Sequence, residues 1–315
     1  MKVLLACAVF LATIGAAVSA EKPIPELIND LGVEEKGNST CNTACGILMT
    51  KKDEAVPYLE EALTNPNERI RYYAVRALGQ IDTDASRHVL IRAFFEASED
   101  VRPHAGYALT WHPHPGAEQV YIELLTEKDP WHAWHAVEAL GTIRSQKAVQ
   151  NLQEIEENPE SWRFYYTAVV ALRKITDQGL SQEVADALAF LREAKYASDI
   201  DEKKLNASAA VIRSNIEAVL PDVLELYLWV AKGNESGREP NAVTLIRDGG
   251  ERAYPYIAIG LRDPDFNVRY KFVELVESLS LARAFPAQLE ALAENDPETL
   301  VRQKASQLLG KEDSE

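Results

Sequence analysis

The sequence predicts an all-α protein, an α-solenoid in which antiparallel helix pairs stack into a right-handed superhelix. Two observations lead to this prediction. One spacing of apolar and small residues recurs every 31–33 residues along most of the chain. A proline also recurs ahead of three of these segments, where the first turn of a helix would lie. A helix pair of this length cannot bury its apolar face alone, so the copies must stack on one another.

Length and composition agree with a globular chain and restrict its partners. The protein has 315 residues, of which 46% are hydrophobic and 26% charged, and its net charge is −16. This charge excludes nucleic acid as a partner class, because phosphate binding requires a basic face. It also disfavours an anionic membrane surface. An acidic field instead favours basic partners and speeds their encounter.

The first twenty residues have the pattern of a cleaved secretory signal. Lys2 precedes an apolar run from Val3 to Ile14, and small residues stand at Val18 and Ala20 ahead of a polar start. The run is too short for a membrane span. We therefore expect a secreted or periplasmic protein that has no membrane insertion after cleavage at residue 20.

The segment 21–52 is expected to cap the array, with a helix over 21–36. It contains Cys41 and Cys45, whereas Cys7 is lost with the signal. In an oxidising compartment a close cysteine pair usually forms a disulfide, and this spacing brings the thiols within reach over one helical turn or a tight loop. We therefore predict a disulfide between Cys41 and Cys45. A Cys-x-x-Cys redox motif is absent from the sequence.

Residues 53–193 are expected to hold the first repeats. In each copy, positions 0, 4, 7 and 8 of the recurrent spacing fall on one face of an α-helix. The small residues at positions 4 and 7 let a neighbouring helix approach closely. A glycine after position 8, as at Gly79, Gly141 and Gly310, suits a left-handed cap that ends the helix. The copies begin at Ile70, Val101, His132 and Phe164.

The period breaks over 194–249 and returns over 250–310. We expect irregular helical repeats in the middle, with helices over 203–220 and 221–231 and a loop near 232–240. Two further copies begin at Val268 and Val301, and residues 311–315 form a frayed tail. The prolines ahead of the repeat helices are Pro57, Pro255 and Pro286.

The residues that carry the pattern, Val-Arg-x-x-Ala-x-x-Ala-Leu-Gly preceded by Ala-Val-Pro, resemble HEAT-like repeats of the phycobilin-lyase type over about 55–193 and 250–310. The resemblance implies the solenoid fold and leaves the activity open, since similar proteins include scaffolds, bilin lyases, DNA glycosylases and a di-iron hydroxylase. The hydroxylase needs His-Glu pairs ahead of the repeat leucines. Here alanine follows both His104 and His135, so that mechanism is rejected, and export of the chain argues against bilin attachment.

Repeats two and three differ chemically from the others. All six histidines lie between residues 88 and 135, and four of the five tryptophans lie between 111 and 162. We call the leucine at position 8 of the first four copies the ladder leucine. The residues five and six positions before it form a row of aromatic and imidazole side chains on successive helices. Such a row can stack an aromatic ligand, bind a peptide or hold a metal ion. The candidate binding residues are Tyr72, Tyr73, His104, Trp134, His135 and Tyr166.

Packing is an alternative explanation for these side chains. His132 occupies the position held elsewhere by Ile70, so we interpret it as a packed core residue. For His104 and His135, packing and function both remain open. His112 and His114 lie in a turn between paired helices and offer a His-x-His pair for a metal ion, although an exposed pair binds weakly.

The leading hypothesis is an exported scaffold that binds a protein or peptide partner through its concave helical surface, with the aromatic row as anchors. The alternative is a metal-binding or small-ligand-binding protein, with or without enzymatic activity, built on the histidine and tryptophan cluster. The known zinc, nucleophile-elbow, Walker and dinucleotide motifs are absent, so we predict no catalytic residue and no cofactor. Glycosylation sequons stand at Asn38, Asn206 and Asn234.

Overall fold

The computed structural model describes residues 22–34, 39–127, 129–193, 201–231 and 239–310, and within them every regular element is a helix. The predicted all-α fold is therefore confirmed. The predicted signal peptide, the tail, most of the predicted loop near 232–240, and the sequons at Asn38 and Asn234 lie outside the described residues. No helix among those described is long and apolar enough to span a membrane.

The chain divides into two compact units, Met1–Ala148 and Val149–Glu315. The division falls between the third and fourth predicted repeats. The spacing of the ladder residues continues across this point without interruption. The repeat pattern, which predicts one continuous array, therefore does not reveal the division.

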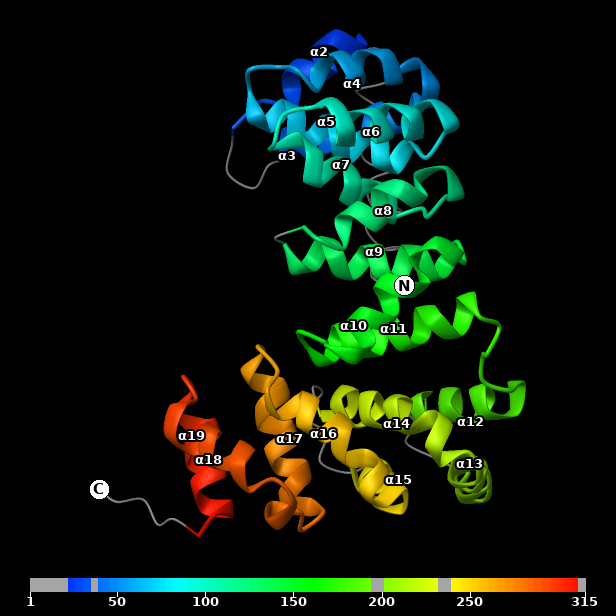
Figure 1. Ribbon diagram of the computed structural model, residues 1–315. Helices are drawn as coiled ribbons and strands as arrows, with labels where there is room; N and C mark the ends of the chain where they lie inside the picture. The colour runs from blue at the N-terminus through cyan, green and yellow to red at the C-terminus, as the bar shows by residue number, and fades with distance from the viewer. Residues whose placement is uncertain (1–21, 35–38, 128, 194–200, 232–238, 311–315) are drawn as a thin grey trace. The chain divides into compact units, whose positions relative to one another are not determined.

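In its described part, the first unit is built from helix pairs in two layers (Figure 1). The first layer contains α2 (Ile24–Asp30), α4 (Val56–Ala62), α6 (Asp84–Glu96) and α8 (Glu118–Leu124). The second layer contains α3 (Ser39–Thr50), α5 (Glu68–Ile81), α7 (Val101–Thr110) and α9 (Pro130–Thr142). Helix α5 packs between α3 and α7, and α7 packs in turn on α9. The first unit thus stacks its repeats in chain order, as a solenoid does.

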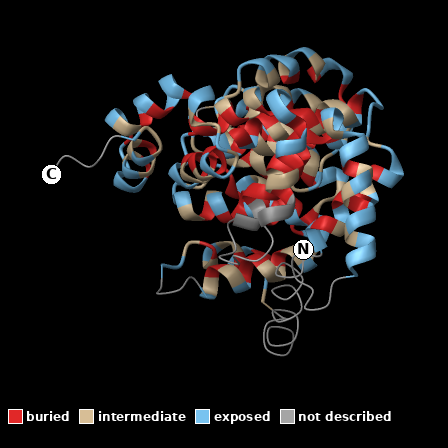
Figure 2. Ribbon diagram, turned by 90° about the horizontal axis from the view of Figure 1, so that it is seen from below, coloured by how far each residue is buried: buried red, intermediate tan, exposed pale blue. Residues whose placement is uncertain are grey.

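The small residues of the repeat lie where the helices approach one another. The alanines at positions 4 and 7 of α5, α7 and α9 are all buried, as predicted. Buried residues gather on the faces where the helices pack together (Figure 2). The prolines Pro57, Pro255 and Pro286 stand in the first turns of their helices, also as predicted. Close packing of small side chains therefore sets the spacing between repeats.

The predicted glycine caps are correct at one position and wrong at two. Gly310 has a left-handed backbone, with φ +68°. Gly79 and Gly141 instead lie inside α5 and α9, and the left-handed residues are Asp82 and Arg144, three positions later. A Cβ atom at Gly79 would lie 2.8 Å from the Cβ of Ala108, so the glycine provides room for α7 rather than a helix stop.

In two repeats, an arginine at position 1 ties the turn before its helix to the next repeat. The guanidinium of Arg71 donates to the carbonyls of Asn65 and Pro66 and to the carboxylate of Asp100, which belongs to the following repeat. Arg269 in the second unit makes the same kind of contacts, with two turn carbonyls and a carboxylate of the next repeat. These arginines donate hydrogen bonds to backbone carbonyls in the turns, which receive none from a helix N–H.

The segment predicted as a cap is a further helix pair, because α3 continues the ladder and packs on α5. Its helix α2 is shorter than the predicted 21–36. Cys41 and Cys45 are both free and are buried in the seam between α3 and α5. This finding corrects the predicted disulfide. The Cys41 thiol donates to the carbonyl of Val33 at 2.9 Å and accepts from Arg69 Nε at 3.4 Å, whereas the Cys45 thiol faces the carbonyl of Tyr73 at 4.0 Å. The two thiols therefore have different partners, and burial raises the pKa of Cys45 to about 11.

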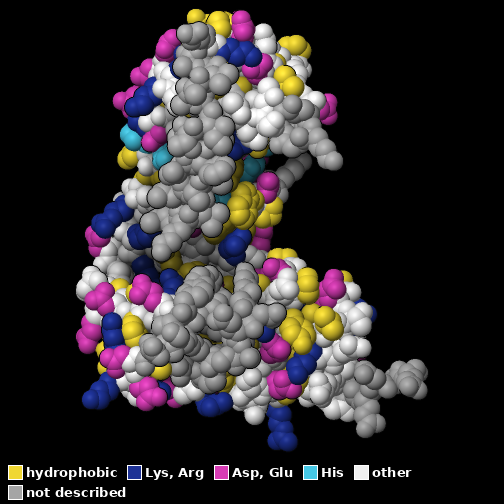
Figure 3. All heavy atoms as spheres, turned by 180° about the vertical axis from the view of Figure 1, so that it is seen from behind, with side chains coloured by type: hydrophobic (Ala, Val, Ile, Leu, Met, Phe, Trp, Pro, Cys, Tyr) yellow, Lys and Arg dark blue, Asp and Glu magenta, His cyan; other side chains and the backbone are white. Residues whose placement is uncertain are grey.

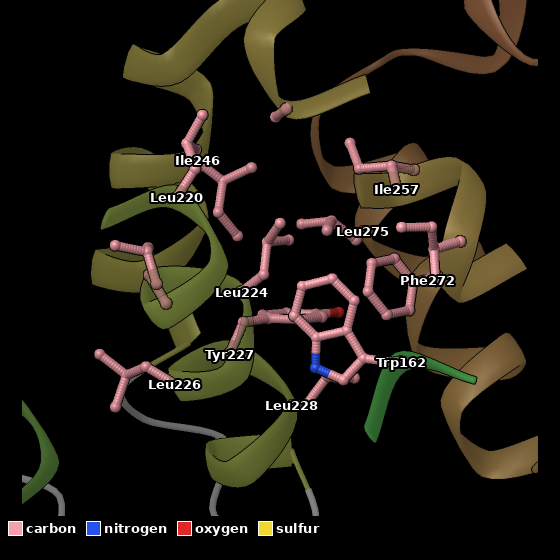
Figure 4. Close-up of a cluster of buried hydrophobic side chains, with 14 of the residues drawn as sticks. Trp162, Leu220, Leu224, Leu226, Tyr227, Leu228, Ile246, Ile257, Phe272 and Leu275 are labelled. Carbon is pink, nitrogen blue, oxygen red and sulfur yellow. The ribbon is translucent and has the colours of Figure 1, made fainter. Parts of the chain in front are cut away.

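The second unit is organised around a central helix, α14, that packs against α11, α12, α13, α15 and α17. In its core the rings of Trp162 and Phe272 lie 5.6 Å apart beside Tyr227 and Leu224 (Figure 4). The helices of this unit are α10 (Val149–Glu157), α11 (Trp162–Ile175), α12 (Gln182–Glu193), α13 (Glu202–Ser214), α14 (Ile216–Ala231), α15 (Glu239–Gly249), α16 (Tyr254–Leu261), α17 (Phe266–Ser278), α18 (Pro286–Asn295) and α19 (Thr299–Leu308).

The predicted helix boundary at Pro221 is wrong. Helix α13 ends at Ser214, where the side-chain amide of Asn215 donates to the carbonyl of Val211. Helix α14 begins at Ile216 and contains Pro221. As the sixth residue of α14, Pro221 lacks the N–H that would bond to the carbonyl of Glu217, and its ring crowds that carbonyl. Burial of the apolar face of α14 offsets this cost.

Candidate functional site

A cluster of aromatic and imidazole rings crosses helices α5, α7 and α9 in the first unit. Neighbouring rings touch along its whole length, with centroids 4.3–6.1 Å apart. Histidine side chains lie beside hydrophobic side chains on this unit (Figure 3). We call this group of touching rings the aromatic cluster. Its members are Tyr72, Tyr73, His104, Tyr107, Trp131, His132, Trp134 and His135.

At the α5 end, two adjacent tyrosines have different environments. Tyr72 is 45% exposed and meets the ring of His104 edge-on at 5.3 Å. Tyr73 is buried, and this burial raises the pKa of its hydroxyl. The guanidinium of Arg69 lies 5.8 Å from the centre of the Tyr73 ring. Tyr72 is therefore the contact surface, and Tyr73 supports it from inside.

A cavity of about 500 Å³ opens beside this end of the cluster. It lies between the N-terminal turns of α5 and α7 and the connection that follows α2. Three of the predicted binding residues, Tyr72, Tyr73 and His104, line it. The charged side chains in its wall are Glu34, Glu68, Arg69, Arg71 and Asp100.

At the α9 end, two tryptophans and a histidine lie on one face of the helix. The rings of Trp131 and Trp134 are 5.1 Å apart, and the ring of His135 lies 4.3 Å from Trp134. Trp131 is 46% exposed. Asp129 caps the helix, since its carboxylate accepts the backbone N–H of Trp131 at 2.9 Å. This cap fixes where α9 starts and hence which residues face outward.

His132 is buried in the middle of the cluster, as its ladder position predicts. Its ring lies 6.1 Å from His104 and 5.1 Å from Tyr107. Desolvation lowers the pKa of His132, although the carboxylate of Asp129, 3.9 Å from its Nε2, acts in the opposite direction. Within the described part of the chain, His132 Nδ1 is buried without a hydrogen-bond partner. The packing around His132 therefore favours the neutral imidazole over the protonated one.

His135 faces both the cluster and the solvent. Its Nδ1 lies 3.1 Å from the carboxylate of Glu138, one turn further along α9. Its Nε2 is buried and, among the described residues, has no hydrogen-bond partner. His104 is half-buried and lines the cavity. Both histidines thus combine packing with a position at the edge of the predicted surface.

His112 and His114 lie in the predicted turn between α7 and α8. His114 Nδ1 accepts the backbone N–H of Gly116 at 3.0 Å and so closes the turn. His112 Nδ1 lies 3.6 Å from the carboxylate of Asp82. Nowhere in the described residues do three histidine, cysteine or acidic side chains converge as metal ligands would. The geometry therefore gives the predicted His112/His114 metal site no third protein ligand.

Tyr166, predicted as the last member of the row, belongs to the second unit. Its hydroxyl donates to the carboxylate of Asp222 at 3.1 Å and accepts from Arg192 at 3.3 Å. Arg173 also donates to Asp222, at 2.7 Å. Burial, with a smaller effect from Asp222, raises the pKa of Tyr166 to about 12. Its contacts are those of a packing residue between α11 and α14.

Two members of the aromatic cluster, Tyr107 and Trp131, were not predicted from the sequence. Tyr107 lies one turn after His104 and joins the rings of His132 and His135. Trp131 lies one turn before Trp134. Both could have been found by extending the row by one helical turn on each helix instead of comparing single aligned positions.

Comparison with known proteins identifies the repeats. The family model for HEAT repeats matches three overlapping segments, residues 40–110, 90–173 and 123–220, which together span more than half of the chain. The search of curated proteins finds no significant match.

Solved structures that resemble the chain are distant from it. Human deoxyhypusine hydroxylase in complex with glycerol is 17% identical, over 84% of this chain and 96% of that chain, with a TM-score of 0.35. The karyopherin Kap121p bound to the extreme C-terminus of the phosphatase Cdc14p is 14% identical, over 96% and 39%, with a TM-score of 0.40. Importin β is 12% identical, over 98% and 51%, with a TM-score of 0.39. At these TM-scores the neighbours carry no argument about function.

Proposed function

Because this chain belongs to the family of HEAT-repeat proteins, we propose that it is an exported scaffold that binds a protein or peptide partner through the aromatic cluster of its first unit. One observation supports this proposal above all. The cluster presents exposed rings at both ends, Tyr72 on α5 and Trp131 on α9, and a cavity opens beside the first of them. Tyrosine and tryptophan dominate the energetics of protein interfaces because they provide large and rigid contact areas.

The exposed rings contribute little to the stacking of repeats. Tyr72 and Trp131 leave nearly half of their surface in contact with solvent, at 45% and 46% exposure. In the aligned repeats the position of Tyr72 also holds Pro103 and Gln303, and the position of Trp131 holds Asp100 and Asn267. The solenoid therefore does not require aromatic rings at these two positions. Exposed aromatic rings on one surface of a cluster are typical of an interaction site.

Export is the second part of the proposal and rests on the pattern of residues 1–20. We expect the mature chain to begin at Glu21 and to accumulate outside the cytoplasm. Mass spectrometry of the N-terminus of the exported protein tests this directly. A chain that is recovered in the cytoplasm with residues 1–20 attached would remove the export proposal and leave the binding surface untouched.

Partner capture by matched variants tests the binding surface. The double variant Tyr72→Ala/Trp134→Ala removes one ring from each end of the aromatic cluster. The control Tyr58→Ala/Phe95→Ala removes two exposed rings of α4 and α6, in the other layer of the same unit. Each protein is immobilised and exposed to the exported fraction of the source cells, and circular dichroism checks its folding.

We expect the wild type and the control variant to retain a common partner and the cluster variant to lose at least about 90% of it, since removal of a hot-spot ring costs about 2 kcal/mol or more. Equal retention by the folded cluster variant would refute the assigned surface. Equal loss from both double variants would show that any exposed ring serves, which also contradicts the proposal.

A further inference from the structure

We propose that the partner of the aromatic cluster is a basic segment that places a cationic side chain, arginine by preference, at each end of the cluster. This inference rests on the proposed function and specifies the chemistry of the partner. It follows from the carboxylates that accompany the exposed rings at the two ends, from the fixed contacts of the nearby arginines, and from the separation of α5 and α9.

At the α5 end, Tyr72 shares its helix face with a carboxylate. Glu68 precedes Tyr72 by four residues and is exposed, so both side chains lie on the same side of α5. Glu34, also exposed, lines the same cavity from the connection after α2. An aromatic ring beside two carboxylates suits a positive charge.

The arginines in the same cavity are held by other groups. Arg71 donates to turn carbonyls and to the carboxylate of Asp100. Arg69 donates from its Nε to the sulfur of Cys41. These contacts fix the two guanidinium groups in the cavity wall, whereas the carboxylates of Glu34 and Glu68 face the solvent. The cavity therefore favours a cationic group over an anionic one.

The α9 end repeats this arrangement. Glu138 follows Trp134 by four residues, and its side chain is 48% exposed. Asp129 lies at the start of the same helix, next to the exposed ring of Trp131, and its side chain is 55% exposed. Two rings 5.1 Å apart are thus accompanied by two accessible carboxylates. Each end of the cluster combines aromatic surface with negative charge.

This combination favours a guanidinium group. A cation over the face of tryptophan or tyrosine is attracted by the ring, and tryptophan gives the strongest interaction. Guanidinium is flat enough to stack on a ring and can at the same time donate two parallel hydrogen bonds to a carboxylate. An ammonium group provides the charge without the stacking plane. We therefore expect arginine to bind more tightly than lysine at either end.

The distance between the two ends sets the spacing of the cationic residues. Helices α5 and α9 are separated by α7, and adjacent packed helices lie about 8–10 Å apart. The two ends are thus roughly 16–20 Å apart. An extended peptide advances about 3.3 Å per residue. Two arginines about five or six residues apart would reach both ends together.

Synthetic peptides test the inference with defined probes. Each peptide has a fluorescein label and two arginines in a glycine–serine chain, and the sequence separation of the arginines varies from two to ten. Fluorescence anisotropy with the full-length protein, at 0.15 M salt to screen long-range attraction, gives the dissociation constants. We expect the tightest binding at a separation of five or six. Replacing either arginine by citrulline, which has a similar shape and no charge, should weaken that binding about tenfold.

Three pairs of neutralising substitutions locate the charges. They are Glu34→Gln/Glu68→Gln at the α5 end, Asp129→Asn/Glu138→Gln at the α9 end, and the control Glu61→Gln/Glu96→Gln on the other layer. Asparagine at position 129 can still cap α9. We expect each end variant to weaken binding about tenfold and to cancel the effect of one citrulline, with the control within twofold of the wild type.

The possible failures are distinguishable. If arginine and citrulline peptides bind equally well and Tyr72→Ala/Trp134→Ala abolishes both, the partner is not basic and the proposed scaffold function stands. If the control pair weakens binding as much as the end variants, only the overall charge matters and the inference is overturned. If the cluster variant still captures its partner from the exported fraction, the proposed function itself fails.

Discussion

At the scale of single residues, His132 is a buried histidine enclosed by other rings. Its side chain is 8% exposed, and in the described part of the chain its Nδ1 has no hydrogen-bond partner. A second N–H on this ring would therefore be buried without an acceptor, which costs free energy. The groups around the ring that influence its charge are Asp129 and Glu127, which favour protonation, and His104 and His135, which oppose it.

This environment predicts a pH dependence of stability. Burial lowers the pKa of His132 in the folded state, so the unfolded chain takes up the proton first as the pH falls. The stabilising contribution is complete above the unfolded value of about 6.5 and declines as the pH drops through that value toward the folded pKa. We expect the free energy of unfolding in urea to fall between pH 7.5 and pH 5.5, and to fall less in His132→Phe. The control His88→Gln, at an exposed histidine, should behave as the wild type; an equal fall in His132→Phe would contradict the assignment.

Residue environments could be predicted only where the repeat register was considered. The ladder position of His132 predicted its burial correctly. The same register places Cys41 and Cys45 at positions 0 and 4 of α3, both of which are buried in the other repeats, and it points the thiols into the seam with α5. The disulfide prediction relied on compartment and spacing instead, and it was wrong because packing decides where a side chain on a helix points.

At the scale of helices, glycine at the α5–α7 contact gives a prediction with an internal control. A methyl group at Gly79 would lie 2.8 Å from the Cβ of Ala108 and 3.1 Å from the ring of Trp111, whereas one at Gly46 in α3 would meet nothing within 4 Å. Gly79→Ala should destabilise the protein by about 1–2 kcal/mol, since overpacking outweighs the gain in helix propensity. Gly46→Ala should stabilise it by about 0.5–1 kcal/mol. Urea denaturation measures both, and two shifts of the same sign would contradict this account.

Helices could be predicted well wherever their apolar face repeats, because the 3.6-residue period records burial directly. The start of α14 could not be predicted from Pro221, since a buried apolar face outweighs the local preference of a proline. The helix ends at Asp82 and Arg144 were missed for a related reason. Non-glycine residues adopt the left-handed conformation there, which residue preferences do not indicate.

At the scale of the whole molecule, the division into two units predicts that damage to one core leaves the other intact. Asp222 in the second unit accepts from Tyr166 and Arg173, and its side chain is 7% exposed. Asp222→Ala should cost about 3 kcal/mol, because it leaves a largely buried arginine without its partner. Hydrogen exchange should then accelerate over α11 and α14 and remain unchanged over α5 and α7.

The matched control is Asp248→Ala, which removes a surface ion pair with Arg213 and should change stability by less than about 1 kcal/mol. Equal acceleration of exchange in both units after Asp222→Ala would show that they unfold as one. This outcome would contradict the two-core description.

The candidate site illustrates the limit of prediction at this scale. Five of the six predicted binding residues belong to the aromatic cluster, because equivalent positions on adjacent repeats lie in a row. Tyr166 has the same position in its repeat but packs toward Asp222 instead. The contact joins residues 56 positions apart in the sequence. A repeat pattern with a period of 31–33 residues does not indicate a contact between residues this far apart. The division of the chain into two units depends on such long-range contacts, so it could not be predicted either.

The confinement of the aromatic cluster to the first unit has a thermodynamic consequence. A molecule that binds a native core and not its unfolded form stabilises that core by mass action, by about 2.7 kcal/mol at a concentration one hundred times its dissociation constant. A partner on the aromatic cluster would thus raise the melting temperature of Met1–Ala148 and leave the second core at its own melting temperature. The gap between two melting transitions would then report occupancy of the surface, even for a partner whose identity is unknown.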